Sequence, residues 1–308
     1  MIEESWLTQS DGQEVYIKKW LDQKQPPIAV VQIAHGMAEH SGRYHEFANF
    51  LVSHGFVVYA NDHRGHGKTG EKMGVMGYYA DENGFERTVE DLKMINDQIH
   101  QTYPELPVFM LGHSMGSFLV RRFIQRYPKA INGVIISGTG AGKGLAGKIG
   151  RFIAHLEIKR HGAKSESALM DKLSFGQFNK KFKNSGSWIS SDPKTVQAYQ
   201  EDPYCGFIST AGFYYDLLGG IELIHKRSEI ARIDQSLPML IISGESDPVG
   251  DYGKGVKRVV KDYQAAGIQS IKLILYPEGR HEMLFEVNRD QVMEDILTWL
   301  TKILSHIK

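Results

Sequence analysis

Residues 107–127 read PVFMLGHSMGSFLVRRFIQRY, where a short apolar run breaks at Gly-His-Ser-Met-Gly and then resumes with helical spacing. The run before the break predicts a strand, and the apolar residues after it recur on one face of a helix. A serine at so sharp a turn, Ser114, needs small neighbours where strand and helix approach each other. Gly112 and Gly116 meet that need.

The start of this helix also presents unpaired N–H groups and a partial positive charge beside the Ser114 hydroxyl. Such a setting suits a reaction that develops an oxyanion. The stretch therefore predicts a nucleophile for acyl transfer. The alternative is a glycine-rich turn in which Ser114 only caps the helix.

The rest of the chain alternates apolar runs with segments of helical periodicity. Expected strands span residues 2–9, 13–20, 28–34, 56–60, 107–111, 133–137, 237–243 and 271–276. The first two form a hairpin around Asp11-Gly12, and the other six alternate with helices. We therefore expect an α/β protein with a mostly parallel eight-stranded sheet and helices on both faces.

Residues 139–235 interrupt this alternation of strands and helices, because they contain helical segments but no clear buried strand. We expect them to form a helical cap inserted after the sixth strand. Residues 1–138 and 236–308 would then form the core.

Composition excludes some functions. The 308 residues carry 36 acidic and 36 basic side chains without a block of like charge, so nothing points to nucleic acid as a partner. One cysteine, Cys205, excludes an internal disulfide and is expected to be a small buried hydrophobe. The acidic start and the lack of a long apolar run predict a cytoplasmic protein. The sequence gives no indication of oligomeric state.

A serine nucleophile needs a histidine base, and a carboxylate to hold the imidazole in the right tautomer. Asp247 follows the seventh expected strand, and His281 follows the eighth and opens the terminal helix. Glu245 and Asp251 compete for the acid role, but Asp247 lies deepest in its loop and precedes a proline. The order Ser114, Asp247, His281 is the one that this topology produces.

Two backbone amides should stabilise the oxyanion. One is the N–H of Met115, directly after the nucleophile, and the other is assigned to Met37 in the loop after the third strand. The segment HEMLF at 281–285 lacks the second histidine of a zinc helix, so neither metal nor cofactor is expected.

Five segments resemble one known family: HGMAEHSGRY at 35–44, NDHRGHG at 61–67, GHSMG at 112–116, SGESDPVG at 243–250 and PEGRHEML at 277–284. They are similar to the monoacylglycerol lipase and lysophospholipase branch of the α/β-hydrolases, a group also labelled serine aminopeptidase. The resemblance implies an eight-stranded sheet with a mobile cap after the sixth strand. It also implies nucleophile, acid and base at Ser114, Asp247 and His281, with oxyanion amides at Met37 and Met115.

The leading hypothesis is a cofactor-free esterase that cleaves a monoacylglycerol or lysophospholipid through an acyl-serine intermediate. The alternatives are a short-chain carboxylesterase or thioesterase with the same triad and, from another class, a catalytically dead hydrolase fold that binds a ligand. Phe152, Ile153, Leu156 and Ile158 lie among basic residues of the cap. They predict either transient contact with a membrane surface, which would make the protein peripheral to the membrane, or packing of the cap against the sheet.

Overall fold

The computed structural model describes residues 1–182 and 187–307, and within them it contains a single eight-stranded sheet of order β1-β2-β4-β3-β5-β6-β7-β8. β2 pairs with both β1 and β4 in antiparallel fashion, and the remaining pairs are parallel. The strands are β1 (Ile2–Thr8), β2 (Glu14–Trp20), β3 (Ala29–Ala34), β4 (Phe56–Asn61), β5 (Val108–His113), β6 (Gly133–Ser137), β7 (Met239–Gly244) and β8 (Ile271–Tyr276). The predicted α/β fold is thus confirmed.

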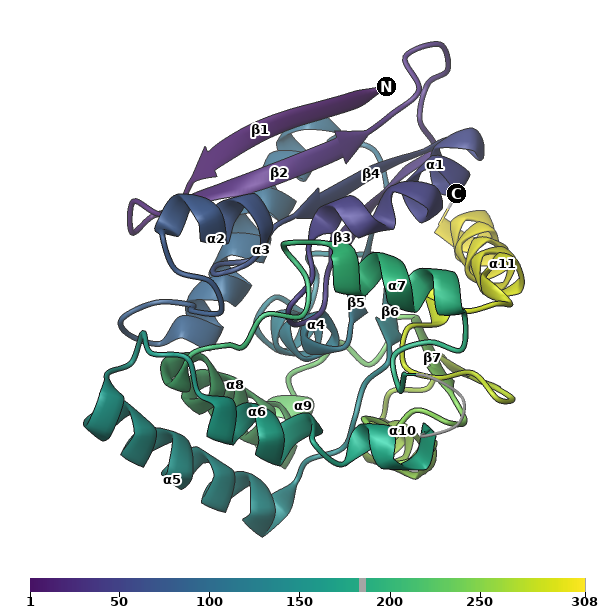
Figure 1. Cartoon of the computed structure of the whole chain (residues 1–308). Helices are drawn as coiled ribbons and strands as arrows, with labels where there is room; N and C mark the ends of the chain where they lie inside the picture. Colours follow the sequence, from purple (N-terminus) through teal and green to yellow (C-terminus); the bar gives the residue numbers. More distant parts are fainter. Residues whose placement is uncertain (183–186, 308) are drawn as a thin grey trace.

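Helices cover both faces of the sheet, which is why every residue of β3 to β7 is buried. One face packs against α3 (Gly84–Thr102), α4 (Met115–Arg126) and α10 (Lys254–Ala265). The other packs against α1 (His45–Ser53) and α11 (Arg289–Ile307), which lie beside each other in Figure 1. Short 3-10 turns, η1 (Ser41–Tyr44) and η3 (Met283–Phe285), precede α1 and α11.

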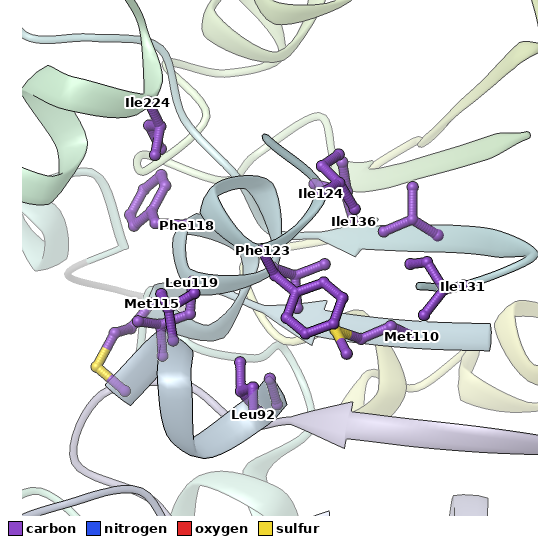
Figure 2. Packing of buried hydrophobic residues seen from close by; sticks show 14 of the residues in the cluster. Leu92, Met110, Met115, Phe118, Leu119, Phe123, Ile124, Ile131, Ile136 and Ile224 are labelled. Carbon is purple, nitrogen blue, oxygen red and sulfur yellow. The ribbon is translucent and has the colours of Figure 1, made fainter. Parts of the chain in front are cut away.

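The helix that follows Ser114 is buried along nearly its whole length. In Figure 2, its residue Phe123 lies beside Met110 of β5, with Leu92 of α3 nearby, while Phe118 points away from them on the opposite side of the helix. Truncating the fully buried Phe123 to alanine is expected to cost about 3–5 kcal/mol of stability. The position of Ser114 is therefore fixed by a helix that is buried along nearly its whole length.

Between β6 and β7 the described residues form helices, and we refer to this stretch as the cap. It contains α5 (Gly144–His161), α6 (Ala168–Phe175), η2 (Phe178–Phe182), α7 (Pro193–Glu201), α8 (Ala211–Ile224) and α9 (Arg227–Ile230). α8 packs on α3 and α4, and α5 packs on the outer side of α8 (Figure 1). Ile224 of α8 lies beside Phe118 of α4 (Figure 2). The residue limits 139 and 235 for a separate cap stay a prediction.

One helix, α2 (Gly67–Met73), was not expected from the sequence, because GKTGEKM contains a single apolar residue and no periodicity. Tertiary hydrogen bonds hold this helix instead. The Thr69 hydroxyl donates to the Asp62 carbonyl oxygen and accepts the N–H of Tyr16 in β2. No helix among the described residues is long and apolar enough to cross a membrane.

Candidate active site

Ser114 is the single residue between β5 and α4. Its backbone conformation, with φ 51° and ψ −118°, is one that few non-glycine residues adopt. The tight approach around it explains both flanking glycines. A Cβ at Gly116 would lie 2.0 Å from the carbonyl oxygen of Ala34, and one at Gly112 would lie 2.5 Å from the carbonyl oxygen of Gly116. A strained serine at a strand end is a recurring sign of a functional site.

The structure brings the three residues that the sequence singled out into one hydrogen-bonded line. His281 Nε2 lies 2.8 Å from Ser114 Oγ, and His281 Nδ1 lies 3.0 Å from Asp247 Oδ2. A carboxylate only accepts, so Nδ1 carries the ring proton and Nε2 offers its lone pair to the serine hydroxyl. The competing Glu245 and Asp251 are exposed, whereas Asp247 is fully buried.

The loop around His281 differs from the prediction in one respect. His281 does not open the terminal helix, because α11 begins only at Arg289. Residues 280–286, which we call the histidine loop, run instead as an irregular segment that includes η3. The loop is therefore held by its own contacts and not by the hydrogen bonds of a helix.

Charges around His281 favour its protonated form. Burial alone would disfavour the imidazolium, but the carboxylate and hydrogen bond of Asp247 outweigh burial, with help from Glu282 and Glu39, and raise the pKa of His281 above 6.5. The ring of His113, which the sequence did not assign to the site, lies 4.9 Å from the His281 ring. Burial, and then repulsion from His281, lower the pKa of His113 to about 3, so this neighbour stays neutral.

The two backbone N–H groups that are expected to bind an oxyanion are available to do so. Among the described residues, neither the Met37 N–H nor the Met115 N–H donates a hydrogen bond. Met37 lies in the turn after β3, where Ala38 has a positive φ of 52°. The N–H of Gly36, one residue earlier, donates to Glu39 Oε1 at 2.5 Å, which fixes the direction of the turn.

A cavity of about 180 Å³ opens onto Ser114 and His281. The sheet side supplies the turn after β3 and the cap side supplies aromatic residues. The cap residues that line it are Asp171, Phe175, Trp188, Ile189, Tyr199, Gly206 and Phe207. Both halves of the molecule thus shape the space in front of the serine.

Cap residues 187–191, which we call the cap strap, are bonded directly to the histidine loop. The N–H of Glu282 donates to the carbonyl oxygen of Ile189 at 2.9 Å, and the Ser190 hydroxyl donates to that of Phe285 at 2.9 Å. The Trp188 ring lies 4.9 Å from the ring of His281. No local pattern could predict this pairing, because about 90 residues separate the two segments.

One group of possible metal ligands occurs in the described part of the chain: His40, Asp202 and Cys205. His40 Nδ1 accepts the N–H of Gly42 at 3.2 Å, so Nε2 carries the proton and donates to Asp202 at 2.9 Å. A metal ion at Nε2 would have to displace this proton and its hydrogen bond to Asp202. Cys205 is partly buried, which is less than expected, and burial raises the pKa of its thiol.

Comparisons with known proteins agree with this architecture. The family model of serine aminopeptidase S33 matches residues 25–288. The chain is 30% identical to a monoacylglycerol lipase of Mycolicibacterium smegmatis, over 91% of this chain and 90% of the relative. It is 28% identical to the monoglyceride lipase of Homo sapiens, over 96% and 89%. A crystal structure of a thermostable carboxyl esterase from Bacillus coagulans in complex with glycerol superposes with a TM-score of 0.90 at 29% identity, covering 98% and 99% of the two chains. The chain therefore belongs to the serine aminopeptidase S33 family of hydrolases.

Proposed function

We propose that the protein hydrolyses carboxylic esters of lipids, with monoacylglycerol or lysophospholipid as the substrate class, through an acyl intermediate on Ser114. The observation that carries the proposal is the hydrogen-bonded line from Ser114 Oγ through both nitrogens of His281 to Asp247. The names of the relatives support the ester substrate.

In this mechanism Ser114 Oγ attacks the ester carbonyl carbon while its proton passes to His281 Nε2. The carbonyl oxygen becomes an oxyanion that accepts hydrogen bonds from the N–H groups of Met37 and Met115. The tetrahedral intermediate then expels the alcohol, which takes the proton from His281. A water molecule repeats the sequence on the acyl-serine and releases the fatty acid.

In this conformation, the small size of the cavity favours a second candidate function, a short-chain carboxylesterase or thioesterase. About 180 Å³ is below the roughly 300–1,000 Å³ of ordinary small-molecule sites. A long acyl chain therefore requires the cap to move, whereas the short acyl group of a carboxylesterase or thioesterase substrate makes no such demand. A ligand-binding module without catalysis would not need a serine, histidine and aspartate in hydrogen-bonding order.

A fluorophosphonate probe tests the nucleophile. We expect it to label the native protein and not Ser114→Ala, because labelling needs an activated hydroxyl. Hydrolysis of an ester series from acetate to palmitate, then of monoacylglycerol and lysophosphatidylcholine, ranks the substrate classes. A native protein that is not labelled would support the binding module, and a maximum at acetate would support the short-chain enzyme.

We also propose that the cap meets lipid surfaces through α5 and α6. Of the four residues that the sequence indicated, Phe152 and Leu156 are exposed, with Phe152 at 61%, while Ile153 and Ile158 are partly buried. The exposed stripe of α5 has helical spacing and continues on α6: Leu145, Ile149, Phe152, Leu156, Leu169 and Leu173. Exposed Lys159 and Arg160 end the same helix and suit an anionic interface.

A further inference from the structure

Arg43 connects the two loops that hold the proposed oxyanion amide and the proposed base. Its guanidinium donates to Glu39 at 2.7 Å and forms a bidentate pair with Glu282 at 2.8 and 2.7 Å. Glu39 belongs to the turn after β3, and Glu282 directly follows His281. Only an arginine can hold two carboxylates in this planar geometry, because lysine acts as a point charge.

Glu39 and Glu282 are also hydrogen-bonded to the backbone near the proposed reacting groups. The second oxygen of Glu39 accepts the N–H of Gly36 at 2.5 Å and the hydroxyl of Tyr44 at 2.9 Å, which orients the His35–Gly36 peptide, directly before the peptide that carries the Met37 N–H. The Glu282 backbone is fixed to the cap strap through its N–H. The side chains of Glu39, Arg43 and Glu282 are all nearly inaccessible, at 2%, 9% and 5% exposed.

Aromatic rings fix the plane of the guanidinium from the sides. Its central carbon lies 4.3 Å from the ring centroid of Phe285 in the histidine loop and 4.9 Å from that of Tyr199 in α7. The Tyr199 hydroxyl donates to the carbonyl oxygen of Ala38 at 2.9 Å, so the cap takes part in the same cluster. Stacking of this kind adds to the electrostatic hold on a buried arginine.

We propose that Arg43 is a positioning residue that sets the distance between the oxyanion amides and His281. The proposal rests on the function proposed above and assigns Arg43 no contact with substrate. Because the guanidinium holds Glu39 and Glu282 together, its loss would let the turn after β3 and the histidine loop move independently. A displacement of about 1 Å between reacting groups can cost about 100-fold in rate.

Arg43 also balances charge at the site. The titratable and charged groups around His281 are Asp247 after β7, His113 at the end of β5, Glu39, Arg43 and Glu282, with Asp171 of α6 lining the same cavity. Glu282 and Glu39 both raise the pKa of His281. Without the Arg43 cation these two negative charges would be less compensated, so the pKa of His281 would rise further.

The test uses Arg43→Gln and Arg43→Lys in the full chain, assayed on a dissolved short ester such as p-nitrophenyl acetate. For Arg43→Gln we expect kcat to fall about 100-fold with KM within about twofold, because positioning acts on the transition state. The acid limb of its pH–rate profile should move upward, by up to about one pH unit. Arg43→Lys should restore the acid limb but recover only part of kcat, because it keeps the charge and lacks the fork.

Arg64 is the matched control. It is also a buried arginine, bidentate to Asp91 at 2.7 and 2.8 Å, but its partners are Asp11 and Asp91, outside the site. We expect Arg64→Gln to lower thermal stability and to leave the kcat and acid limb of the folded protein unchanged. Circular dichroism at the assay temperature shows which variants are folded.

Two results would overturn the proposal. One is an Arg43→Gln protein with wild-type kcat and acid limb. The other is an equal loss of kcat in Arg43→Gln and Arg64→Gln, which would make Arg43 merely structural. If Arg43→Gln does not fold, Arg43→Lys is the deciding variant. The proposal requires Arg43→Lys to have a lower kcat than the wild type and an unchanged acid limb. Labelling of the wild type by a fluorophosphonate probe keeps these outcomes separate from failure of the proposed function itself.

Discussion

Acid should destabilise this protein through buried histidines, and His66 allows the effect to be measured at one side chain. Its ring is fully buried between Phe207 and Phe213 of the cap and His35 of the core. Its Nδ1 donates to the Arg64 carbonyl oxygen at 2.9 Å. Burial lowers the pKa of His66 from 6.5 to about 4.

The sign and size follow from linkage. The folded pKa lies below the unfolded one, so the stability due to His66 is present above about pH 6.5 and is lost as pH falls toward 4. Between pH 7 and 5 an unfolded histidine goes from about one quarter to nearly full protonation, while folded His66 stays mostly neutral. The unfolding free energy should therefore drop by about 2 kcal/mol through this residue alone.

The assay is urea unfolding of the wild type and His66→Gln at pH 7 and pH 5. The variant is expected to be less stable at both values, but its drop between them should be smaller by about 2 kcal/mol, because glutamine does not titrate. Contributions of groups that do not interact with His66 cancel in this difference. The control is His54→Gln, since His54 is exposed to water in the folded protein too. Equal drops in the wild type and His66→Gln would refute the reasoning.

Three further predictions concern the site and the cap. Asp247→Asn should lower kcat by about 10⁴-fold, because the imidazole loses the partner that sets its tautomer, and near-normal turnover of the folded variant would remove Asp247 from the proposed triad. Activity should rise with pH through a pKa above 6.5, because the base must be neutral and its environment raises the pKa of His281; a midpoint below 6.5 would contradict this. Phe152→Ser should reduce cosedimentation with vesicles containing anionic lipid and leave hydrolysis of a dissolved ester unchanged, whereas the partly buried Ile153→Ser serves as control for packing. Unchanged vesicle binding by Phe152→Ser would argue against lipid contact through α5.

The sequence predicted the sheet and the residues that meet at its edge, because both depend on local patterns. Apolar runs and glycine turns identify buried strands, and parallel strands bring their carboxyl ends together whatever the loops contain. This is why Ser114, Asp247 and His281 could be named in advance from strand ends. Their geometry agrees with the proposed roles, and the roles themselves await the variants above.

The partners of Arg43 could not be predicted in this way. Glu282 lies 239 residues further along the chain, and no periodicity relates the two. A signal was present in HGMAEHSGRY, where Glu39 and Arg43 stand four residues apart in a segment that turns out to be mostly buried. Buried charges require partners, but which partner they find depends on how the loops pack. Packing also decides which face of α5 is exposed. Because α5 packs on α8, Ile153 and Ile158 are partly buried, and the exposed stripe differs from the expected one.

The bonds between the cap strap and the histidine loop bear on how this protein could be inhibited. Any movement that lifts residues 187–191 away must break the hydrogen bonds of Ile189 and Ser190 and remove Trp188 from the His281 ring. A small molecule wedged beneath these residues would therefore free the histidine loop from the cap strap, so that the imidazole is no longer held against Ser114, without blocking the hydroxyl itself. Its signature would be a serine that is open to solvent yet no longer labelled by a fluorophosphonate, which distinguishes such a compound from one that occupies the acyl site.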